Sequence, residues 1–123
     1  PLLLTQALMS MLIESEGKAH VVNIGSMGGF QGSQKFAGLS VYSATKGALA
    51  ILTECLAAEY AEEDVAFNCL ALGSADTEML RKAFPGYKSS MSPKKIAEYI
   101  VDFSLKAQHF YNGKVLPVAG LST

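Results

Sequence analysis

The run Ala19-His20-Val21-Val22-Asn23-Ile24 decides the fold, together with the glycine-rich stretch Gly25-Ser26-Met27-Gly28-Gly29-Phe30-Gln31-Gly32 that follows it. The first six residues are mainly apolar and β-branched, which is typical of a strand buried on both faces. The glycines behind them require the chain to turn. Ser26 is therefore expected at the carboxyl end of a parallel strand, where open α/β sheets bind their ligands.

Helical and extended segments alternate on both sides of this strand. Apolar residues at helical spacing predict a helix up to about Glu16, where Gly17 can end it. Downstream we predict a helix over about 42–61, a strand over 65–72, a short helix over 77–84, a helix from Ser92 with Pro93 in its first turn, and a strand over 114–118. Helices between buried strands predict an α/β fold with a parallel sheet and right-handed crossovers.

Composition narrows the classes of partner. The 123 residues are 50% hydrophobic and carry a net charge of −1, which argues against nucleic acid or an anionic membrane as a partner. No apolar run approaches the ~20 residues of a membrane span, and residues 1–13 lack the features of a signal peptide. Cys55 and Cys69 have neither metal-site spacing nor the density of a disulfide scaffold. We therefore expect no metal, and two buried thiols in the reducing cytoplasm.

The segment Tyr42-Ser43-Ala44-Thr45-Lys46 carries groups suited to proton transfer. On a helix, a spacing of four residues puts the phenol and the ammonium on one face, one turn apart. Two unit charges about 4 Å apart interact by roughly 4 kcal/mol at an effective dielectric of ~20, so the ammonium can favour the phenolate. An isolated pair of this kind is more often a plain surface contact. The serine at the strand end, sixteen residues earlier, is the context that favours a chemical role.

A strand-end serine followed by Tyr-x-x-x-Lys resembles the catalytic core of the short-chain dehydrogenase/reductase family. Three later segments are similar to the family's strand and Pro-Gly-x-x-x-Thr loop, its penultimate helix and its final strand, in that order: residues 65–77, 91–97 and 111–118. The resemblance covers nearly the whole chain. It implies a Rossmann-like, three-layer, doubly wound parallel sheet, of which this chain carries about three strands with flanking helices.

The resemblance also implies an oxidoreductase that transfers a hydride between a nicotinamide cofactor, NAD or NADP, and a small carbonyl or secondary alcohol substrate. Tyr42 would be the general acid/base. Lys46 would stabilise its phenolate and bind the nicotinamide ribose. Ser26 would hydrogen-bond and polarise the substrate oxygen.

Further cofactor contacts are implied for the loop after the second strand. The backbone of Gly73 and Ala75 would face the carboxamide, and Thr77 would offer a hydroxyl to the cofactor. Leu72 stands where the family usually has proline, and the spacing from Gly73 to Thr77 is intact.

The interval from Ser26 to Tyr42 is about three residues longer than the family's common spacing. Ser33 and Ser40 are therefore rival candidates for the serine role, and Ser26 is preferred because it directly follows the strand. Asn23 is expected to bond backbone near the strand end.

The family's dinucleotide fingerprint, G-x-G-x-x-G, has no match here. In the family it belongs to an earlier strand-to-helix turn. We therefore expect residues 1–123 to be a single partial domain, the carboxy-terminal catalytic half, inactive alone and with an exposed strand edge that invites pairing or aggregation. The family often associates through the helices matching residues 1–14 and 42–61, which implies a homodimer or homotetramer.

Two other classes of function remain as alternatives. A serine hydrolase needs G-x-S-x-G, and Ile24 occupies the first glycine position before Ser26. It also needs a histidine within reach, and neither His20 nor His109 is an obvious candidate. A non-catalytic relative that serves as a scaffold or dimerisation module is the stronger alternative, although the intact Ser26, Tyr42 and Lys46 argue against it.

Overall fold

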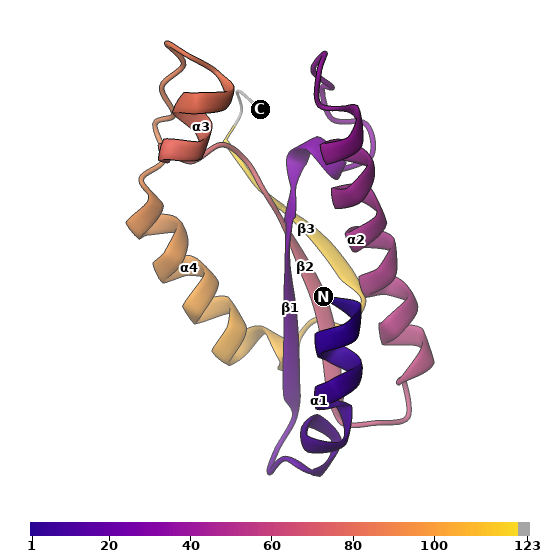
Figure 1. Cartoon of the computed structure of the whole chain (residues 1–123). Helices are drawn as coiled ribbons and strands as arrows, with labels where there is room; N and C mark the ends of the chain where they lie inside the picture. The colour runs from indigo at the N-terminus through magenta and orange to yellow at the C-terminus, as the bar shows by residue number, and fades with distance from the viewer. Residues whose placement is uncertain (121–123) are drawn as a thin grey trace.

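The computed structural model describes residues 1–120, in which helices and strands alternate along the chain (Figure 1). The elements are α1 (Leu2–Glu14), β1 (Ala19–Ser26), the 3₁₀ turn η1 (Met27–Gly29), α2 (Ser40–Glu59), β2 (Val65–Leu72), α3 (Glu78–Ala83), α4 (Pro93–Lys106), the 3₁₀ turn η2 (Ala107–His109) and β3 (Lys114–Val118). The second and third predicted strands are confirmed residue for residue. β1 extends to Ser26, two residues beyond its predicted end, and neither 3₁₀ turn was predicted.

The three strands form one parallel sheet in the order β1-β2-β3. Ser26 pairs with Leu72, and Leu72 pairs with Val118, so the three carboxyl ends lie at one edge of the sheet. Helices α1 and α2 cover one face and α4 covers the other (Figure 1). The predicted three-layer, Rossmann-like α/β architecture is confirmed.

The central strand β2 holds the core together. Its residues from Val65 to Ala71 are all buried, because both faces are covered. On the side of α1 and α2 the buried cluster comprises Met9, Leu56, Ala57, Val65 and Phe67, and on the side of α4 it comprises Leu70, Phe103 and Ala107. Fully burying a large apolar side chain contributes about 1.5–3 kcal/mol, so these two clusters fix the helices on the sheet.

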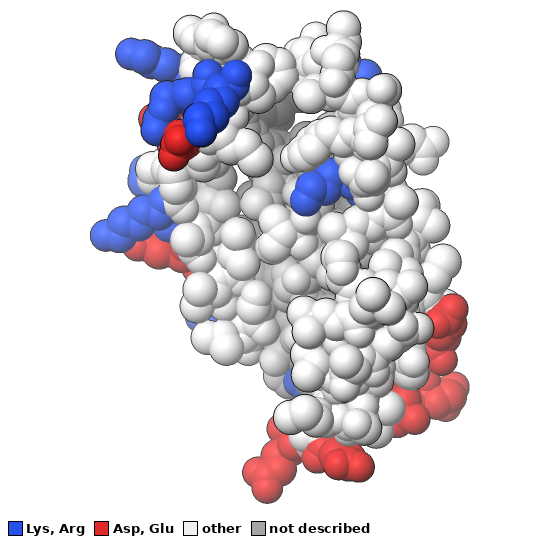
Figure 2. Space-filling view, in the orientation of Figure 1, with Lys and Arg blue, Asp and Glu red and all other residues white. Residues whose placement is uncertain are grey.

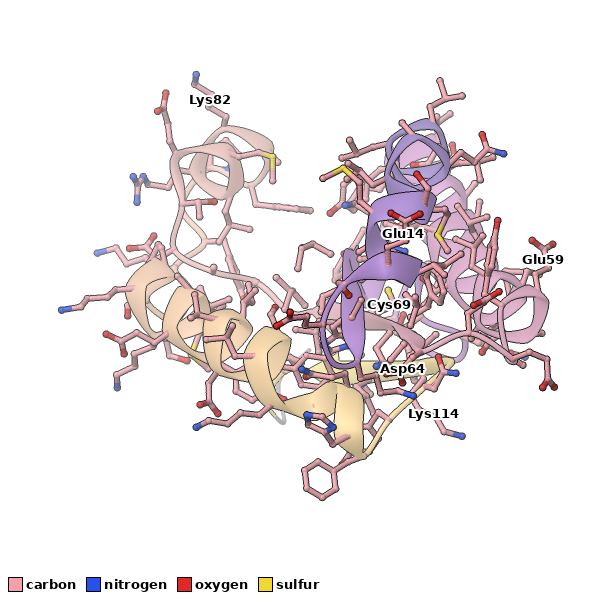
Figure 3. The ribbon with its side chains drawn as sticks, turned by 90° about the horizontal axis from the view of Figure 1, so that it is seen from below. Glu14, Glu59, Asp64, Cys69, Lys82 and Lys114 are labelled. Atoms are coloured by element: carbon pink, nitrogen blue, oxygen red, sulfur yellow. The ribbon has the colours of Figure 1, made fainter. Side chains whose placement is uncertain are left out.

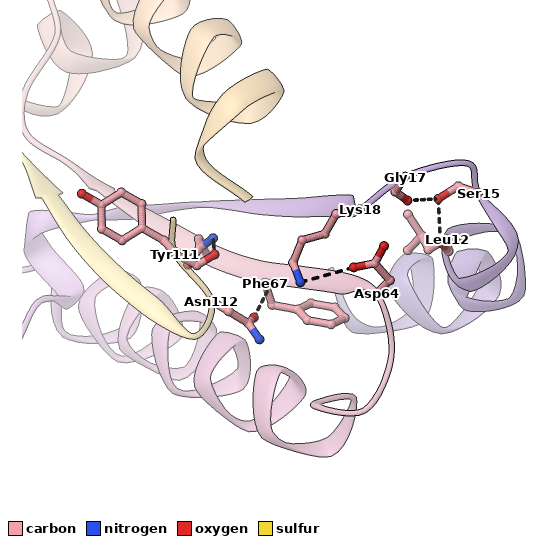
Figure 4. A network of polar contacts seen from close by, with 9 residues as sticks. Leu12, Ser15, Gly17, Lys18, Asp64, Phe67, Tyr111 and Asn112 are labelled. Atoms are coloured by element: carbon pink, nitrogen blue, oxygen red, sulfur yellow. Dashed lines mark hydrogen bonds and ion pairs between the residues drawn. The ribbon is translucent and has the colours of Figure 1, made fainter. Parts of the chain in front are cut away.

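Hydrogen bonds at the amino end of the sheet fasten the connections between elements (Figure 4). The Lys18 ammonium lies 3.4 Å from the Asp64 carboxylate, which joins the residues that precede β1 and β2. The Asn112 side-chain oxygen accepts a hydrogen bond from the Phe67 N–H at 2.9 Å. The chain that leads into β3 is thereby tied to β2.

Local capping explains where α4 begins. The Ser92 hydroxyl accepts from the Lys95 N–H at 3.2 Å, and Pro93 occupies the first helical position of α4. This capped start confirms the prediction. Helix α1 ends at Glu14, two residues before the predicted end, where Ser15 leaves the helical conformation.

Basic, acidic and large apolar side chains occupy different parts of the surface. Lys and Arg gather around α3, near the carboxyl edge of the sheet, whereas Asp and Glu gather at the opposite end (Figure 2). Large apolar side chains are exposed on α1 and α2, among them Leu3, Leu4, Met11, Val41 and Ile51. No helix within residues 1–120 combines the length and hydrophobicity that a membrane span requires.

Candidate active site

Ser26 and Tyr42 both lie beside Gly28, at the carboxyl edge of the sheet. Ser26 is the last residue of β1, and Tyr42 lies in the first turn of α2. A Cβ placed on Gly28 would lie 3.4 Å from the Ser26 hydroxyl oxygen and 3.4 Å from Cε1 of the Tyr42 ring. The glycine leaves space between the two side chains. The nearest side-chain atom to that Cβ position is the Ser43 hydroxyl oxygen, at 3.3 Å.

Lys46 lies one turn further along α2. Its ammonium donates to the Ile24 carbonyl of β1 at 2.9 Å and lies 6.0 Å from the centre of the Tyr42 ring. The expected placement of the phenol and the ammonium on neighbouring turns of one helix is therefore present. A positive charge at this distance acts on the ring and on any anion formed beside it.

Gly29 sets how closely the turn after β1 approaches α2. A Cβ at Gly29 would lie 2.5 Å from the Gly47 nitrogen and 2.7 Å from the Lys46 Cβ, closer than real Cβ atoms come. The missing side chain therefore lets η1 pack directly on the backbone that carries Lys46.

The three candidate serines differ in what their hydroxyls contact. The Ser26 oxygen accepts from the Gly28 N–H at 3.0 Å, so its own proton can still be donated to a substrate oxygen. The Ser33 hydroxyl contacts the Met27 carbonyl and receives the Lys35 ammonium at 2.6 Å, so it holds its own loop together. Ser40 is the exposed first residue of α2.

The loop after β2 lies at the same edge as Ser26, because Leu72 pairs with that residue. The Gly73 N–H donates to the Val118 carbonyl at 2.9 Å, so the group that Gly73 can offer to a carboxamide is its own carbonyl. The Thr77 N–H donates to the Ala75 carbonyl at 2.8 Å. The Thr77 hydroxyl accepts from the Leu80 N–H at 3.2 Å and caps α3, which leaves its proton for a further partner.

A buried hydrogen bond beneath the site corrects the expectation for Asn23. Its side-chain amide donates to the hydroxyl of Thr53 at 3.0 Å rather than to backbone. Thr53 is fully buried on the face of α2 that packs on the sheet, and its hydroxyl donates in turn to the Leu49 carbonyl at 2.9 Å. The sequence predicted the strand and the helix, but gave no sign that these two side chains meet.

The two cysteines differ, and the expectation for one of them was wrong. Cys69 is fully buried in β2, and Figure 3 shows it inside the molecule. Burial raises the pKa of its thiol, against smaller opposing effects of the Gly25 backbone, the Thr53 hydroxyl and the Lys46 charge. Cys55 is exposed, because it lies on the side of α2 that faces away from the sheet. Among residues 1–120, no three His, Cys, Asp or Glu side chains gather as a metal site would require.

Comparison with known proteins agrees with this fold. The model of the short chain dehydrogenase family matches residues 1–88. An uncharacterized oxidoreductase of Staphylococcus aureus (strain N315) is 31% identical over 103 residues, which are 84% of this chain and 42% of that protein.

Two solved structures show the same architecture. A short chain dehydrogenase from Escherichia coli CFT073, solved in complex with NADPH, gives a TM-score of 0.79 at 27% identity, covering 94% of this chain and 47% of that one. A 3-oxoacyl-[acyl-carrier protein] reductase from Brucella melitensis with bound NAD gives 0.72 at 26% identity, covering 95% and 45%.

The chain spans less than half the length of each of these proteins. The family match nevertheless covers well over half of the chain and includes β1, η1, α2 and β2. These elements carry the serine, the tyrosine and the lysine. By sequence and by fold, the chain belongs to the short-chain dehydrogenase family.

Proposed function

We propose that the protein containing this chain is an NAD(P)-dependent oxidoreductase that interconverts a carbonyl compound and a secondary alcohol. The observation that carries the proposal is that Ser26 and Tyr42 both lie beside Gly28, with Lys46 one turn further along α2. The family membership and the oxidoreductase relatives support the same class of reaction.

Each of the three residues has a distinct role in this proposal. The Ser26 hydroxyl donates to the substrate oxygen and stabilises the negative charge that develops there. The Tyr42 phenol gives its proton to that oxygen in reduction and takes it back in oxidation. The Lys46 ammonium stabilises the phenolate by direct electrostatic attraction. A bound nicotinamide supplies or accepts the hydride.

The residues at this edge suit a nicotinamide cofactor. The Lys46 ammonium can donate to ribose hydroxyls, the Gly73 carbonyl can accept from a carboxamide, and the Thr77 hydroxyl has a proton to donate. Leu72 and Ala75 would complete this side of the cofactor site. One similar structure holds NADPH and another holds NAD, so the proposal covers both cofactors.

The assembly proposed for the whole protein follows from the exposed apolar residues of α1 and α2. Leu3 is 81% exposed and Val41 is 74% exposed, more than expected for helices whose outer faces meet water. A homodimer or homotetramer through α1 and α2 would bury them. We place the protein in the cytoplasm, regard residues 1–123 as its catalytic half, and expect that half to be inactive alone.

Replacing Tyr42 with phenylalanine tests the assignment. In the full-length protein, we expect Tyr42→Phe to lower NADH- or NADPH-dependent turnover of a panel of ketones and alcohols by at least about 10²-fold, because the proton donor is lost and the ring is kept. Tyr99→Phe is the matched control, since Tyr99 is half-exposed on α4 at the other face of the sheet. Unchanged turnover in Tyr42→Phe would refute the catalytic role.

Alanine variants decide among the three serines. We expect Ser26→Ala to lower kcat by about 10²–10³-fold, the usual loss when one donor to a developing oxyanion is removed. Ser33→Ala should mainly loosen the loop before α2, and Ser40→Ala should have little effect. If kcat falls more in Ser33→Ala or Ser40→Ala than in Ser26→Ala, the proposed role belongs to that serine instead of Ser26.

The serine hydrolase alternative gains no support. The His20 ring lies six residues before Ser26 in β1, and its nitrogens contact the Ser104 carbonyl and the Asn68 side chain. Labelling of Ser26 by a fluorophosphonate would favour that alternative. Tight nicotinamide binding without turnover of any carbonyl compound would favour the non-catalytic relative.

A further inference from the structure

The proposed chemistry requires two elements to be aligned. Ser26 belongs to β1, whereas Tyr42 and Lys46 belong to α2, so sliding the helix along the strand would change the position of the serine relative to the other two. A displacement of about 1 Å at a catalytic group can cost on the order of 100-fold in rate. The hydrophobic attraction between α2 and the sheet is non-directional, so it specifies the position of the helix along the strand less sharply than a directional hydrogen bond does.

The hydrogen bond between Asn23 and Thr53 is a directional link between these elements. The Asn23 amide donates to the Thr53 hydroxyl at 3.0 Å, and Asn23 is 8% exposed while Thr53 is fully buried. Because the Thr53 hydroxyl gives its own proton to the Leu49 carbonyl, its oxygen faces Asn23 as an acceptor. A slide of α2 would leave a buried N–H without a partner.

The two partners of this bond lie in the two elements that carry the proposed catalytic groups. Asn23 precedes Ser26 by three residues, and Thr53 follows Lys46 by seven, which is about two helical turns. The neighbour of Asn23, Ile24, provides the carbonyl that receives the Lys46 ammonium. A displacement of either element at Asn23 or Thr53 would therefore also move the residues that carry the proposed groups.

We propose that Asn23 and Thr53 are positioning residues whose buried hydrogen bond sets the place of α2 along β1 and thereby aligns Ser26 with Tyr42 and Lys46. This inference rests on the proposed oxidoreductase function. Gly29 acts in concert with the pair, since its contact with Lys46 and Gly47 sets the separation of the two elements while the pair sets their axial position.

Three variants of the full-length protein separate positioning from stability. Thr53→Val keeps the shape and removes the hydroxyl, whereas Thr53→Ser keeps the hydroxyl. The double variant Asn23→Leu/Thr53→Val replaces both partners by apolar groups of similar size, an exchange that can leave stability nearly unchanged. Ser104→Ala is the matched control, because the Ser104 hydroxyl donates to the Ile100 carbonyl within α4, on the other face of the sheet.

We expect kcat to fall by about 10–100-fold in Thr53→Val and in the double variant, while the KM for the cofactor changes by less than about threefold. Thr53→Ser should retain kcat within about threefold, and Ser104→Ala should resemble wild type. When Ser26 is already replaced by alanine, Thr53→Val should lower kcat by a much smaller factor than it does in the wild-type protein, because the hydroxyl that Thr53 helps to align is absent.

The outcomes distinguish this inference from the function on which it rests. A wild-type kcat in both Thr53→Val and the double variant, whatever their melting temperatures, would show a purely structural role and overturn the inference. If Ser26→Ala and Thr53→Val lower kcat by independent factors that multiply in the combined variant, the inference is overturned as well. A wild-type protein without any nicotinamide-dependent turnover would refute the proposed function itself, and this inference with it.

Discussion

The side-chain amide of Asn68 donates a hydrogen bond to Nε2 of His20 at 2.9 Å. The other ring nitrogen, Nδ1, lies 3.1 Å from the Ser104 carbonyl, which can only accept, so Nδ1 carries the proton and Nε2 is the acceptor. Asn68 is fully buried and also donates to the Tyr111 carbonyl and accepts from the Lys114 N–H. A neutral His20 is therefore part of a network that joins all three strands to α4.

We expect the protein to lose stability as the pH falls below about 6.5, the ordinary pKa of histidine. Burial lowers the pKa of His20, and the hydrogen bond to the Ser104 backbone opposes this only in part. Below that pH the unfolded chain takes up the proton before the folded one does, so the free energy of unfolding falls until the pH passes the folded pKa. Urea denaturation of the full-length protein between pH 8 and pH 5 measures the effect.

Two histidine variants provide the controls for the pH dependence. His20→Gln should flatten the stability profile in this range, because the titrating group is removed. His109→Gln should leave the slope unchanged, since no network of this kind surrounds that residue among residues 1–120. A slope that persists in His20→Gln would assign the pH dependence to another group.

Gly29 and Gly47 face each other, and alanine at the two positions should have opposite effects. A Cβ at Gly29 would meet the α2 backbone at 2.5 Å, so we expect Gly29→Ala to cost about 1–3 kcal/mol or more and to lower kcat. A Cβ at Gly47 would meet only the Gly29 carbonyl, at the ordinary distance of 3.5 Å. Gly47→Ala should therefore stabilise the protein by roughly 0.5–1 kcal/mol, since alanine favours a helix interior. Chemical denaturation measures the free energy of unfolding of both variants. Equal losses of stability in the two variants would contradict the packing described.

Gly25 and Cys69 should show coupled energies. A Cβ at Gly25 would lie 2.7 Å from the Cys69 sulfur and 3.3 Å from the Leu70 carbonyl. We expect Gly25→Ala to cost about 1–3 kcal/mol, and the double variant Gly25→Ala/Cys69→Ala to cost less than the sum of the two single variants. Denaturant titration of the four proteins measures the coupling. Strictly additive losses in the Gly25 and Cys69 variants would show that these two residues do not touch. As a control, Cys55→Ala, at an exposed position, should leave the free energy of unfolding within about 0.5 kcal/mol of wild type.

Much of the fold was predictable because its signals are local. Val65 to Leu72 is an uninterrupted apolar strand, and Ser92-Pro93 is a helix start whose capping needs no distant partner. The candidate catalytic residues were predicted from a similar local pattern, a strand end followed by tyrosine and lysine one helical turn apart, together with the family resemblance. Two predictions about tertiary surroundings were wrong: Asn23 bonds Thr53 instead of backbone, and Cys55 is exposed rather than buried.

The sequence by itself determined the order of strands and helices and the chemical groups at the candidate site, because both depend on residue types within a few positions of one another. Only the tertiary structure decided that Asn23 lies against Thr53, that Gly29 touches the backbone of Lys46, and that Asn68 holds a neutral His20. These contacts join residues that are 17 to 48 positions apart in the chain. Their geometry depends on how the helices settle on the sheet, a balance of packing and buried hydrogen bonds that local spacing does not specify.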